Sequence, residues 1–333
     1  MTKMFSPAVP PRRLRGGPAR IVSRALAVIA VAGLAVGAAA ARAQSVVRTL
    51  TVAGLERSYR LHVPPDLPRN GTAALILVFH GRGGDGAGME RLTGFSALAD
   101  RAGFVVAYPD GVGRSWNDGR AMSGSEAQRR NIDDVAFVAA VIDSLSAELR
   151  LDPRRIFATG LSNGGTFAHY LAANLSRRIA AIASVAGGLA WPFAQRFAPA
   201  APVSVLIMQG TADPLVPYRG GAVAGGRLGR EAGAEATARL WEDADGMRAE
   251  PATGLLPDTD PDDHCRVSWQ RWSGGRKRTE VWLYKLEGGG HTWPGGPQYL
   301  PRRLVGRVCR DFDATFAIWD FFLGHEKAAE GEK

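Results

Sequence analysis

The stretch that most constrains the fold of this chain is Gly-Leu-Ser-Asn-Gly, at residues 160–164. A short apolar run precedes it, as expected for a buried strand, and a segment with helical spacing follows it. Gly-x-Ser-x-Gly between a strand and a helix is typical of a nucleophile held on a sharp turn. Side chains two residues before or after the serine would clash there, which explains Gly160 and Gly164. We therefore predict that Ser162 is a nucleophile; the alternative is a glycine-rich turn with an incidental serine.

Strands and helices alternate along the rest of the chain. This alternation predicts an α/β fold with a mostly parallel central sheet and helices on both faces. Two alternating segments around a glycine-containing turn, 46–52 and 58–63, predict an antiparallel hairpin at the edge of the sheet. Residues 266–272 and 279–286 predict a further two-stranded unit. The expected core strands are 73–79, 103–109, 155–159, 181–185 and 203–208, and the expected helices are 89–102, 132–149, 164–175, 231–241 and 312–323.

The first 43 residues have the composition of a secretory signal peptide. They contain seven basic and no acidic residues, and an apolar run at 25–41 leads to Ala-Arg-Ala, with cleavage expected after Ala43. The alternative is an uncleaved membrane anchor. We expect a secreted or periplasmic protein with no stable membrane anchor after cleavage. Residues 44–333 are expected to form a single catalytic domain, in which 219–236 and 251–264 are surface excursions.

Cleavage also changes what the charge implies. The whole chain has a net charge of +9, but the exported part keeps 34 basic and 32 acidic residues, a net charge of +2. We therefore expect no nucleic-acid partner. The two cysteines, Cys265 and Cys309, both lie in the exported part, where an oxidising compartment favours a disulfide over free thiols.

A serine nucleophile needs a base, and the base needs an orienting carboxylate; on this fold they follow in the order Ser, acid, His. Asp213 comes just after the strand 203–208, and His291 follows a strand and three glycines. Asp110 and Asp118 precede the serine, which breaks that order. The other histidines lie elsewhere: His62 in a strand, His80 before a glycine-rich loop, His169 on a helix, His264 in an acidic stretch and His325 in the tail.

Acyl transfer also needs two N–H donors for the oxyanion. The residue after the nucleophile supplies one, so we expect the main-chain N–H of Asn163 to be a donor. The loop after the third strand, His-Gly-Arg-Gly-Gly at 80–84, supplies the other, at Arg82 or a neighbour. The acidic residues at 258–263 lack the EF-hand pattern and are interpreted as a solvated loop, so no metal is expected.

Six segments together resemble the secreted esterases that group polyhydroxybutyrate depolymerase-like proteins with feruloyl and acetylxylan esterases. The segments are LVFHGRGG, YPDGVGRSWNDGR, IDDVAFVAAVID, RIFATGLSNGG, QGTADPLVPY and GGGHTWPGG. The resemblance implies an α/β-hydrolase fold, a triad of Ser162, Asp213 and His291, and no cofactor. Two positions depart from the family pattern: Gln209 stands where His is frequent, and Arg82 where Cys is common.

The expected activity is hydrolysis of carboxylic esters through an acyl-enzyme intermediate. Feruloyl or acetyl esters of plant polysaccharides and short hydroxyalkanoate oligomers are the expected substrates, because no linker or substrate-binding domain follows the catalytic domain. The alternatives are a depolymerase acting on solid polyester and a catalytically silent binding protein. Trp116 and Trp293 are expected to line the acyl or sugar site, with a packing role as the alternative for Trp293.

Overall fold

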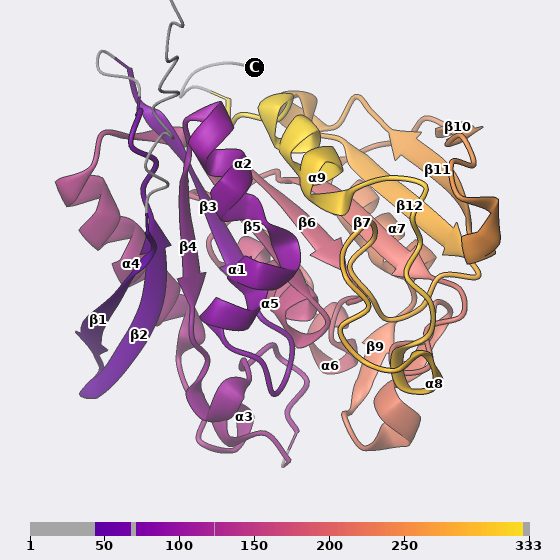
Figure 1. Cartoon of the computed structure of the whole chain (residues 1–333), viewed down its shortest axis with the longest axis horizontal. Helices are drawn as coiled ribbons and strands as arrows, with labels where there is room; N and C mark the ends of the chain where they lie inside the picture. The colour runs from indigo at the N-terminus through magenta and orange to yellow at the C-terminus, as the bar shows by residue number, and fades with distance from the viewer. Residues whose placement is uncertain (1–43, 68–70, 123, 329–333) are drawn as a thin grey trace, which may run out of the picture. The chain divides into compact units, whose positions relative to one another are not determined.

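One ten-stranded sheet runs through the part of the chain that the computed structural model describes, residues 44–67, 71–122 and 124–328 (Figure 1). The predicted signal peptide lies outside the described residues. The strand order is β1-β2-β4-β3-β5-β6-β7-β12-β11-β10, and the six neighbouring strands from β4 to β12 are parallel. The strands are β1 Val46–Val52, β2 Leu55–His62, β3 Ala73–Phe79, β4 Val105–Pro109, β5 Leu151–Leu161, β6 Ala181–Val185, β7 Ser204–Gly210, β10 Ala252–Leu255, β11 Arg266–Trp272 and β12 Val281–Glu287.

The predicted edge hairpin is confirmed. Strands β1 and β2 pair antiparallel, with Val52 opposite Leu55. The two residues between them, Ala53 and Gly54, have φ of 49° and 78°. Positive φ at both central positions is what a two-residue hairpin turn needs to match the twist of its strands. Strand β2 then pairs antiparallel with β4, which attaches the hairpin to the parallel part of the sheet.

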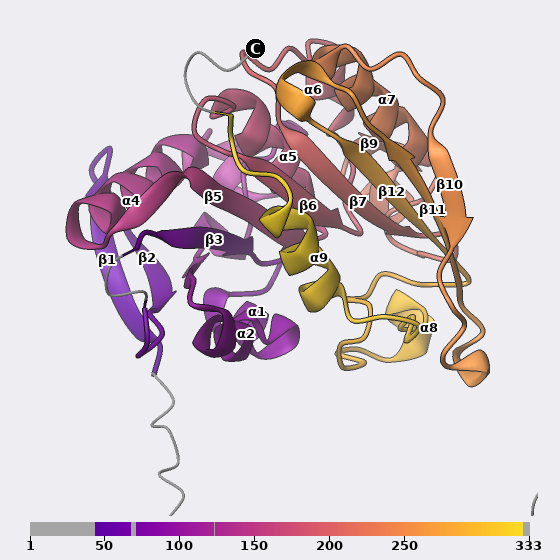
Figure 2. The same ribbon diagram turned by 90° about the horizontal axis from the view of Figure 1, so that it is seen from above.

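Helices cover both faces of the sheet, as predicted (Figure 2). Successive residues of β3 supply opposite faces: Leu75 and Leu77 belong to one buried cluster, and Ile76 and Val78 to the other. The first cluster packs under α4, α5 and α7, and the second under α1, α2 and α9. The helices are α1 Gly86–Thr93, α2 Phe95–Ala102, α3 Glu126–Arg129, α4 Asp134–Glu148, α5 Asn163–Asn174, α6 Trp191–Ala194, α7 Ala234–Asp245, α8 Arg302–Val305 and α9 Ala314–Leu323.

Three local predictions need correction, and one is confirmed. The helix expected at 89–102 is two helices, because Gly94 adopts a left-handed φ of 68° and ends α1. The two-stranded unit expected at 266–272 and 279–286 is confirmed, because β11 and β12 pair antiparallel; β12 also pairs in parallel with β7, which joins the unit to the main sheet. The excursion at 251–264 contains an edge strand, β10, which pairs with β11. The excursion at 219–236 holds a small ribbon of β8 (Gly220–Ala222) and β9 (Arg230–Ala232) and the start of α7.

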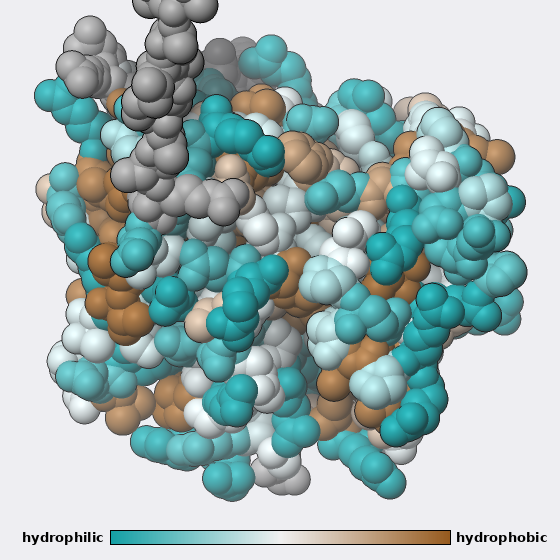
Figure 3. Space-filling model, in the orientation of Figure 1, coloured by the Kyte–Doolittle hydropathy of each residue, from teal (hydrophilic) through white to brown (hydrophobic). Residues whose placement is uncertain are grey.

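The disulfide expected between Cys265 and Cys309 is present, with a Cα–Cα distance of 5.4 Å. It joins the residue before β11 to the segment between α8 and α9. Across residues 44–328, the short gaps excepted, none of the helices combines the length and apolar character needed to cross a membrane. On the face drawn in Figure 3, charged and polar side chains are interspersed with small apolar groups.

Candidate active site

The main chain turns sharply at Ser162, the single residue between β5 and α5. Its φ of 59° and ψ of −122° are unusual for a residue with a side chain. Such a conformation costs on the order of 1–3 kcal/mol and persists only where the surroundings impose it. Here the serine N–H donates to Val185 O at 2.8 Å, and Thr166 N–H donates to the serine carbonyl at 2.9 Å. The turn is therefore fixed from both sides, by β6 and by the first turn of α5.

Two glycines let strand and helix approach closely enough to form this turn. A Cβ added to Gly164 would lie 2.2 Å from Phe79 O, and one added to Gly160 would lie 2.6 Å from the carbonyl carbon of Gly164. Neither contact is possible for a real side chain, and both involve main-chain atoms. The spacing of the glycines in the motif thus follows from the packing of α5 against β3 and β5.

Asp213 and His291 meet at the carboxyl edge of the sheet, beyond the ends of the adjacent strands β7 and β12. His291 Nδ1 lies 2.8 Å from Asp213 Oδ2, and both side chains are almost fully buried. Because a carboxylate only accepts, Nδ1 carries the proton of this hydrogen bond. The other nitrogen, Nε2, is then the one with a free lone pair.

Asp213 is held by donors besides the histidine. Its Oδ1 accepts from the N–H groups of Leu215 and Val216, each at 2.8 Å. Its Oδ2 also accepts from Gln209 Nε2 at 3.1 Å, and the same amide donates to Val216 O at 2.9 Å. Gln209 was notable in the sequence only as a departure from the family pattern. Its position on β7, four residues before the aspartate, places its amide on the carboxylate.

The loop that carries His291 is fixed by its contacts with residues 305–309. His291 N–H donates to Val305 O at 2.5 Å, and Gly290 N–H donates to Arg307 O at 2.8 Å. The Tyr299 hydroxyl donates to His291 O at 3.0 Å. Cys309, at the end of the same segment, forms the disulfide with Cys265. The disulfide therefore holds the segment on which the histidine loop is mounted.

Ser162 and His291 line the same cavity, whose volume is about 570 Å³. Asp213 lies behind the histidine and does not line the cavity. Glycine-rich main chain from 80–84 forms one wall. Aliphatic side chains form much of the rest: Met89, Leu92, Leu161, Leu215, Leu228, Pro297 and Leu300.

The loop at 80–84 lines this cavity, and two of its main-chain N–H groups are already bonded, Gly83 to Arg114 O at 2.7 Å and Gly84 to Gly81 O at 2.9 Å. Burial lowers the pKa of His80, which is held neutral: its Nδ1 lies 2.8 Å from Gly81 O, and its Nε2 accepts from Gly111 N–H at 3.0 Å. Among the residues that the structure describes, no acceptor is bonded to the main-chain N–H of Arg82 or Asn163. The Arg82 side chain donates to Gly124 O at 2.9 Å.

The two tryptophans expected to line the substrate site do not reach it. Trp116 is fully buried, donates from Nε1 to His80 O at 2.9 Å and stacks on Phe167 with ring centroids 4.9 Å apart. Trp293 is equally buried and donates from Nε1 to Thr315 Oγ1 at 3.0 Å. Both rings pack in the core beneath the loops that form the cavity, so we correct that expectation to a packing role.

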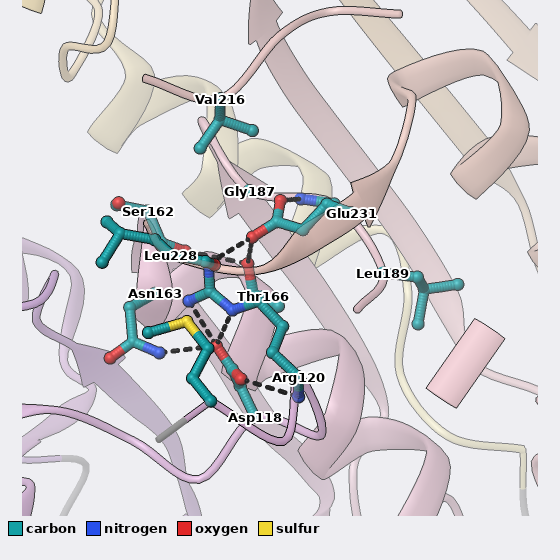
Figure 4. Close-up of polar contacts among 12 residues, drawn as sticks. Asp118, Arg120, Ser162, Asn163, Thr166, Gly187, Leu189, Val216, Leu228 and Glu231 are labelled. Atoms are coloured by element: carbon teal, nitrogen blue, oxygen red, sulfur yellow. Dashed lines mark hydrogen bonds and ion pairs between the residues drawn. The ribbon is translucent and has the colours of Figure 1, made fainter. Parts of the chain in front are cut away.

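Beneath Ser162 lies a buried cluster of charged side chains that the sequence did not reveal (Figure 4). Arg120 lies between two carboxylates, with Nη2 2.5 Å from Asp118 Oδ2 and Nη1 2.9 Å from Glu231 Oε1. The Asn163 side chain donates to Asp118 Oδ2 at 2.6 Å. Asp118 was considered in the sequence only as a possible triad acid, and Glu231 was assigned to a surface excursion. Neither position carried a local signal of burial.

Comparison with known proteins finds esterases. The family described as "Esterase PHB depolymerase" matches residues 57–216. A putative esterase, NocK, from Nocardia uniformis subsp. tsuyamanensis is 36% identical over 298 residues, which cover 85% of this chain and 84% of that protein. The chain belongs to the PHB depolymerase esterase family.

Two further similar proteins are a feruloyl esterase and an acetyl xylan esterase. Feruloyl esterase B of Piromyces equi is 30% identical over 228 residues, covering 66% of this chain but only 40% of that protein. Among solved structures, the acetyl xylan esterase from Aspergillus awamori superposes with a TM-score of 0.55 at 16% identity, covering 74% of this esterase and 94% of that chain. The structural likeness supports the α/β-hydrolase fold expected from the sequence.

Proposed function

We propose that this esterase is a serine carboxylesterase in which Ser162 is the nucleophile, His291 the general base and Asp213 the carboxylate that orients the base. Membership of an esterase family gives ester hydrolysis as the reaction class. One observation carries the mechanism. The strained Ser162 and His291 follow different strands and line one cavity, and His291 is bonded to Asp213 at 2.8 Å.

The hydrogen bond to Asp213 assigns the roles of the two imidazole nitrogens. Since Nδ1 donates to the carboxylate, Nε2 accepts the Ser162 proton as the hydroxyl oxygen attacks the ester carbonyl carbon. Asp213 keeps the histidine in this tautomer and stabilises the imidazolium. The imidazolium then protonates the leaving alcohol, which leaves an acyl group on Ser162. Water, deprotonated by the same nitrogen, attacks the acyl carbonyl carbon. The bond from that carbon to Ser162 Oγ then breaks, Nε2 returns the proton to Oγ, and the acid is released.

Main-chain N–H groups of Arg82 and Asn163 are proposed to stabilise the oxyanion. Neither N–H donates to an acceptor among the described residues. Asn163 directly follows the serine, and Arg82 lines the cavity that Ser162 also lines. Asn163 is also the first residue of α5, where the helix dipole favours negative charge. Loss of one such donor typically lowers the rate by about 10²–10³-fold.

The proposed substrates are soluble carboxylic esters: feruloyl or acetyl esters of plant polysaccharides, or short hydroxyalkanoate oligomers. Relatives named as feruloyl and acetylxylan esterases support this class. A cavity of about 570 Å³ with aliphatic walls is suited to an apolar acyl or alkyl group. Export from the cytoplasm is proposed as well, because disulfides persist in oxidising compartments and this chain contains one.

The test compares wild type with Ser162→Ala on p-nitrophenyl acetate and butyrate. We expect the variant to lose at least about 10⁴-fold in kcat/KM. Ser268→Ala, on the remote strand β11, is the matched control and should keep wild-type activity. A serine-directed phosphonate should label residue 162 in the wild type. An unchanged rate in Ser162→Ala would rule out the serine mechanism. Methyl ferulate, acetylated xylan and a hydroxybutyrate trimer then rank the substrates.

A further inference from the structure

Arg120 is a buried arginine that contacts two carboxylates, although it is not one of the proposed catalytic residues. Only 6% of it is exposed. Nε and Nη2 donate to Asp118 Oδ2 at 2.8 and 2.5 Å, and Nη1 lies 2.9 Å from Glu231 Oε1. Nη1 also donates to the carbonyl of Leu228 at 3.2 Å. The guanidinium thus joins residues 118–120 to residues 228–231, two segments that are far apart in the sequence (Figure 4).

Both carboxylates are fixed to the helix that begins at the nucleophile. Asp118 accepts from the side chain of Asn163 at 2.6 Å. Glu231 accepts from Thr166 Oγ1 at 2.8 Å, and Thr166 N–H donates to Ser162 O at 2.9 Å. The position of the guanidinium relative to the serine is therefore set by contacts within the first turn of α5.

The segment that Arg120 contacts through Leu228 is rich in glycine. Apart from Arg120 it is held by main-chain hydrogen bonds, such as that from Ala224 N–H to Leu215 O at 2.7 Å and that from Leu228 N–H to Val223 O at 3.2 Å. Residues 223–229 include three glycines with positive φ, Gly225, Gly226 and Gly229. Glycine-rich main chain offers little side-chain packing and has high conformational entropy to lose on ordering. Within this segment only Leu228 lines the cavity that contains Ser162. Its carbonyl is the group that Arg120 binds.

The electrostatics of the cluster favour a rigid contact. Burial would lower the pKa of Arg120, but Asp118 and Glu231 raise it, so the guanidinium stays charged. Burial raises the pKa of Glu231, while Arg120 opposes that rise. Guanidinium nitrogens are held in a fixed planar fork, so Arg120 can bond Asp118, Glu231 and the Leu228 carbonyl at once. An ammonium group in its place would be a single charge centre unable to span all three.

We propose that Arg120 is a positioning residue that determines how large a substrate group this esterase accepts, because it holds Leu228 against the cavity at a fixed position relative to Ser162. The proposal rests on the proposed serine esterase function and adds to it a determinant of substrate size. Loss of this hold lets the glycine-rich segment move outward. The kcat/KM for esters with longer groups then rises relative to that for esters with shorter groups.

The test measures selectivity for chain length and not activity alone. Two ester series are used, one varying the acyl group from acetate to octanoate, the other varying the alcohol of an acetate. Leu228→Ala should raise kcat/KM for long over short groups in one series by about tenfold or more, since a methylene in an apolar pocket changes selectivity by about 10–200-fold. Arg120→Lys should shift the same series in the same direction. The double variant should match Leu228→Ala alone, because both changes remove one wall.

Arg57→Lys is the matched control. Arg57 is also buried and pairs with a carboxylate, at 2.7 Å from Asp134 Oδ1, but it does not contact residues 223–231. We expect it to lower stability while leaving the length ratio at the wild-type value. If Arg120→Lys does not fold, Glu231→Gln is measured in its place. It should shift the ratio of kcat/KM for long over short groups in the same direction, by a smaller factor.

Two results would overturn the proposal. One is an Arg120→Lys variant that slows all esters by a single factor; the other is a double variant in which the two shifts multiply. Failure of the serine mechanism would look different, because Ser162→Ala would then keep its activity. An inactive Ser162→Ala together with an unchanged length ratio in Arg120→Lys refutes the positioning role alone.

Discussion

Breaking the disulfide between Cys265 and Cys309 should destabilise the folded protein by about 4 kcal/mol. The two cysteines are 44 positions apart, and in the chain-entropy model a loop of that length gives a contribution of about this size. Nearby contacts concentrate the effect on the catalytic loop. Gly295 N–H donates to Cys309 O at 2.8 Å, and the partners of the His291 loop lie at 305–307, just before the cysteine.

The assay is thermal unfolding of three samples: oxidised wild type, wild type reduced under native conditions, and Cys265→Ala/Cys309→Ala. A change of 1 kcal/mol shifts the Tm of a domain of this size by about 2 °C or a little more, so a loss of about 8 °C is expected on reduction. The reduced wild type keeps both sulfur atoms and so isolates the covalent bond. The double alanine variant adds the effect of the cavity left by two buried side chains.

A reduced protein that unfolds within about 2 °C of the oxidised one would refute this reasoning, because loop entropy would then not limit the stability of the fold. Two free thiols in the unreduced protein would refute it earlier, by showing that the bridge is absent. If the bridge steadies His291, kcat on p-nitrophenyl acetate should also fall on reduction, measured below the melting temperature of the reduced form.

Three further changes have outcomes that follow from single contacts. Gly164→Ala should abolish folding, because its Cβ would lie 2.2 Å from a main-chain oxygen of β3. Gly124→Ala should express normally, since no atom lies within 4 Å of the added carbon. The yield of soluble protein checks both expectations. Gln209→Met removes one donor from the buried Asp213 carboxylate, and kcat/KM should fall about tenfold or more, as expected for a hydrogen bond to a charged group. Burial raises the pKa of Asp245 from 3.8 to about 6, so the folded protein binds this proton more tightly than the unfolded chain and loses stability as the pH rises from about 4 to about 6. Urea unfolding should therefore find Asp245→Asn similar to wild type near pH 4 and more stable, by up to about 3 kcal/mol, at pH 7.

The elements that the sequence predicted well are those with a local physical cause. The glycines around Ser162 are required by main-chain contacts within a few residues of the turn. Asp213 and His291 were predicted from a topological rule, that parallel strands end at a common edge, and the structure brings them within 2.8 Å. The catalytic roles of the three residues stay predictions until the variants are measured.

Predictions based only on nearness in the sequence were less successful. Trp116 stands beside polar motif residues and Trp293 beside His291, yet neighbouring side chains in a loop can point to opposite sides. Both indoles point into the core, where each N–H finds an acceptor. The break at Gly94 was missed for a related reason: helical spacing continues through 89–102, and only the conformation of one residue separates two helices.

The charged cluster under Ser162 is a case that no local pattern predicts, because its members come together only after the sheet has formed. Asp118 and Arg120 are two residues apart, but Glu231 is more than 100 positions further along, in glycine-rich sequence. Removing two carboxylates and a guanidinium from water costs several kcal/mol per ion unless each is well paired. Here each is bonded to the others or to the first turn of α5. An apolar cluster of similar volume would fill the space with a smaller desolvation cost, but it would make no directional hydrogen bonds. Directional bonds are what a main-chain carbonyl such as that of Leu228 needs if the wall of the cavity is to keep its distance from the nucleophile.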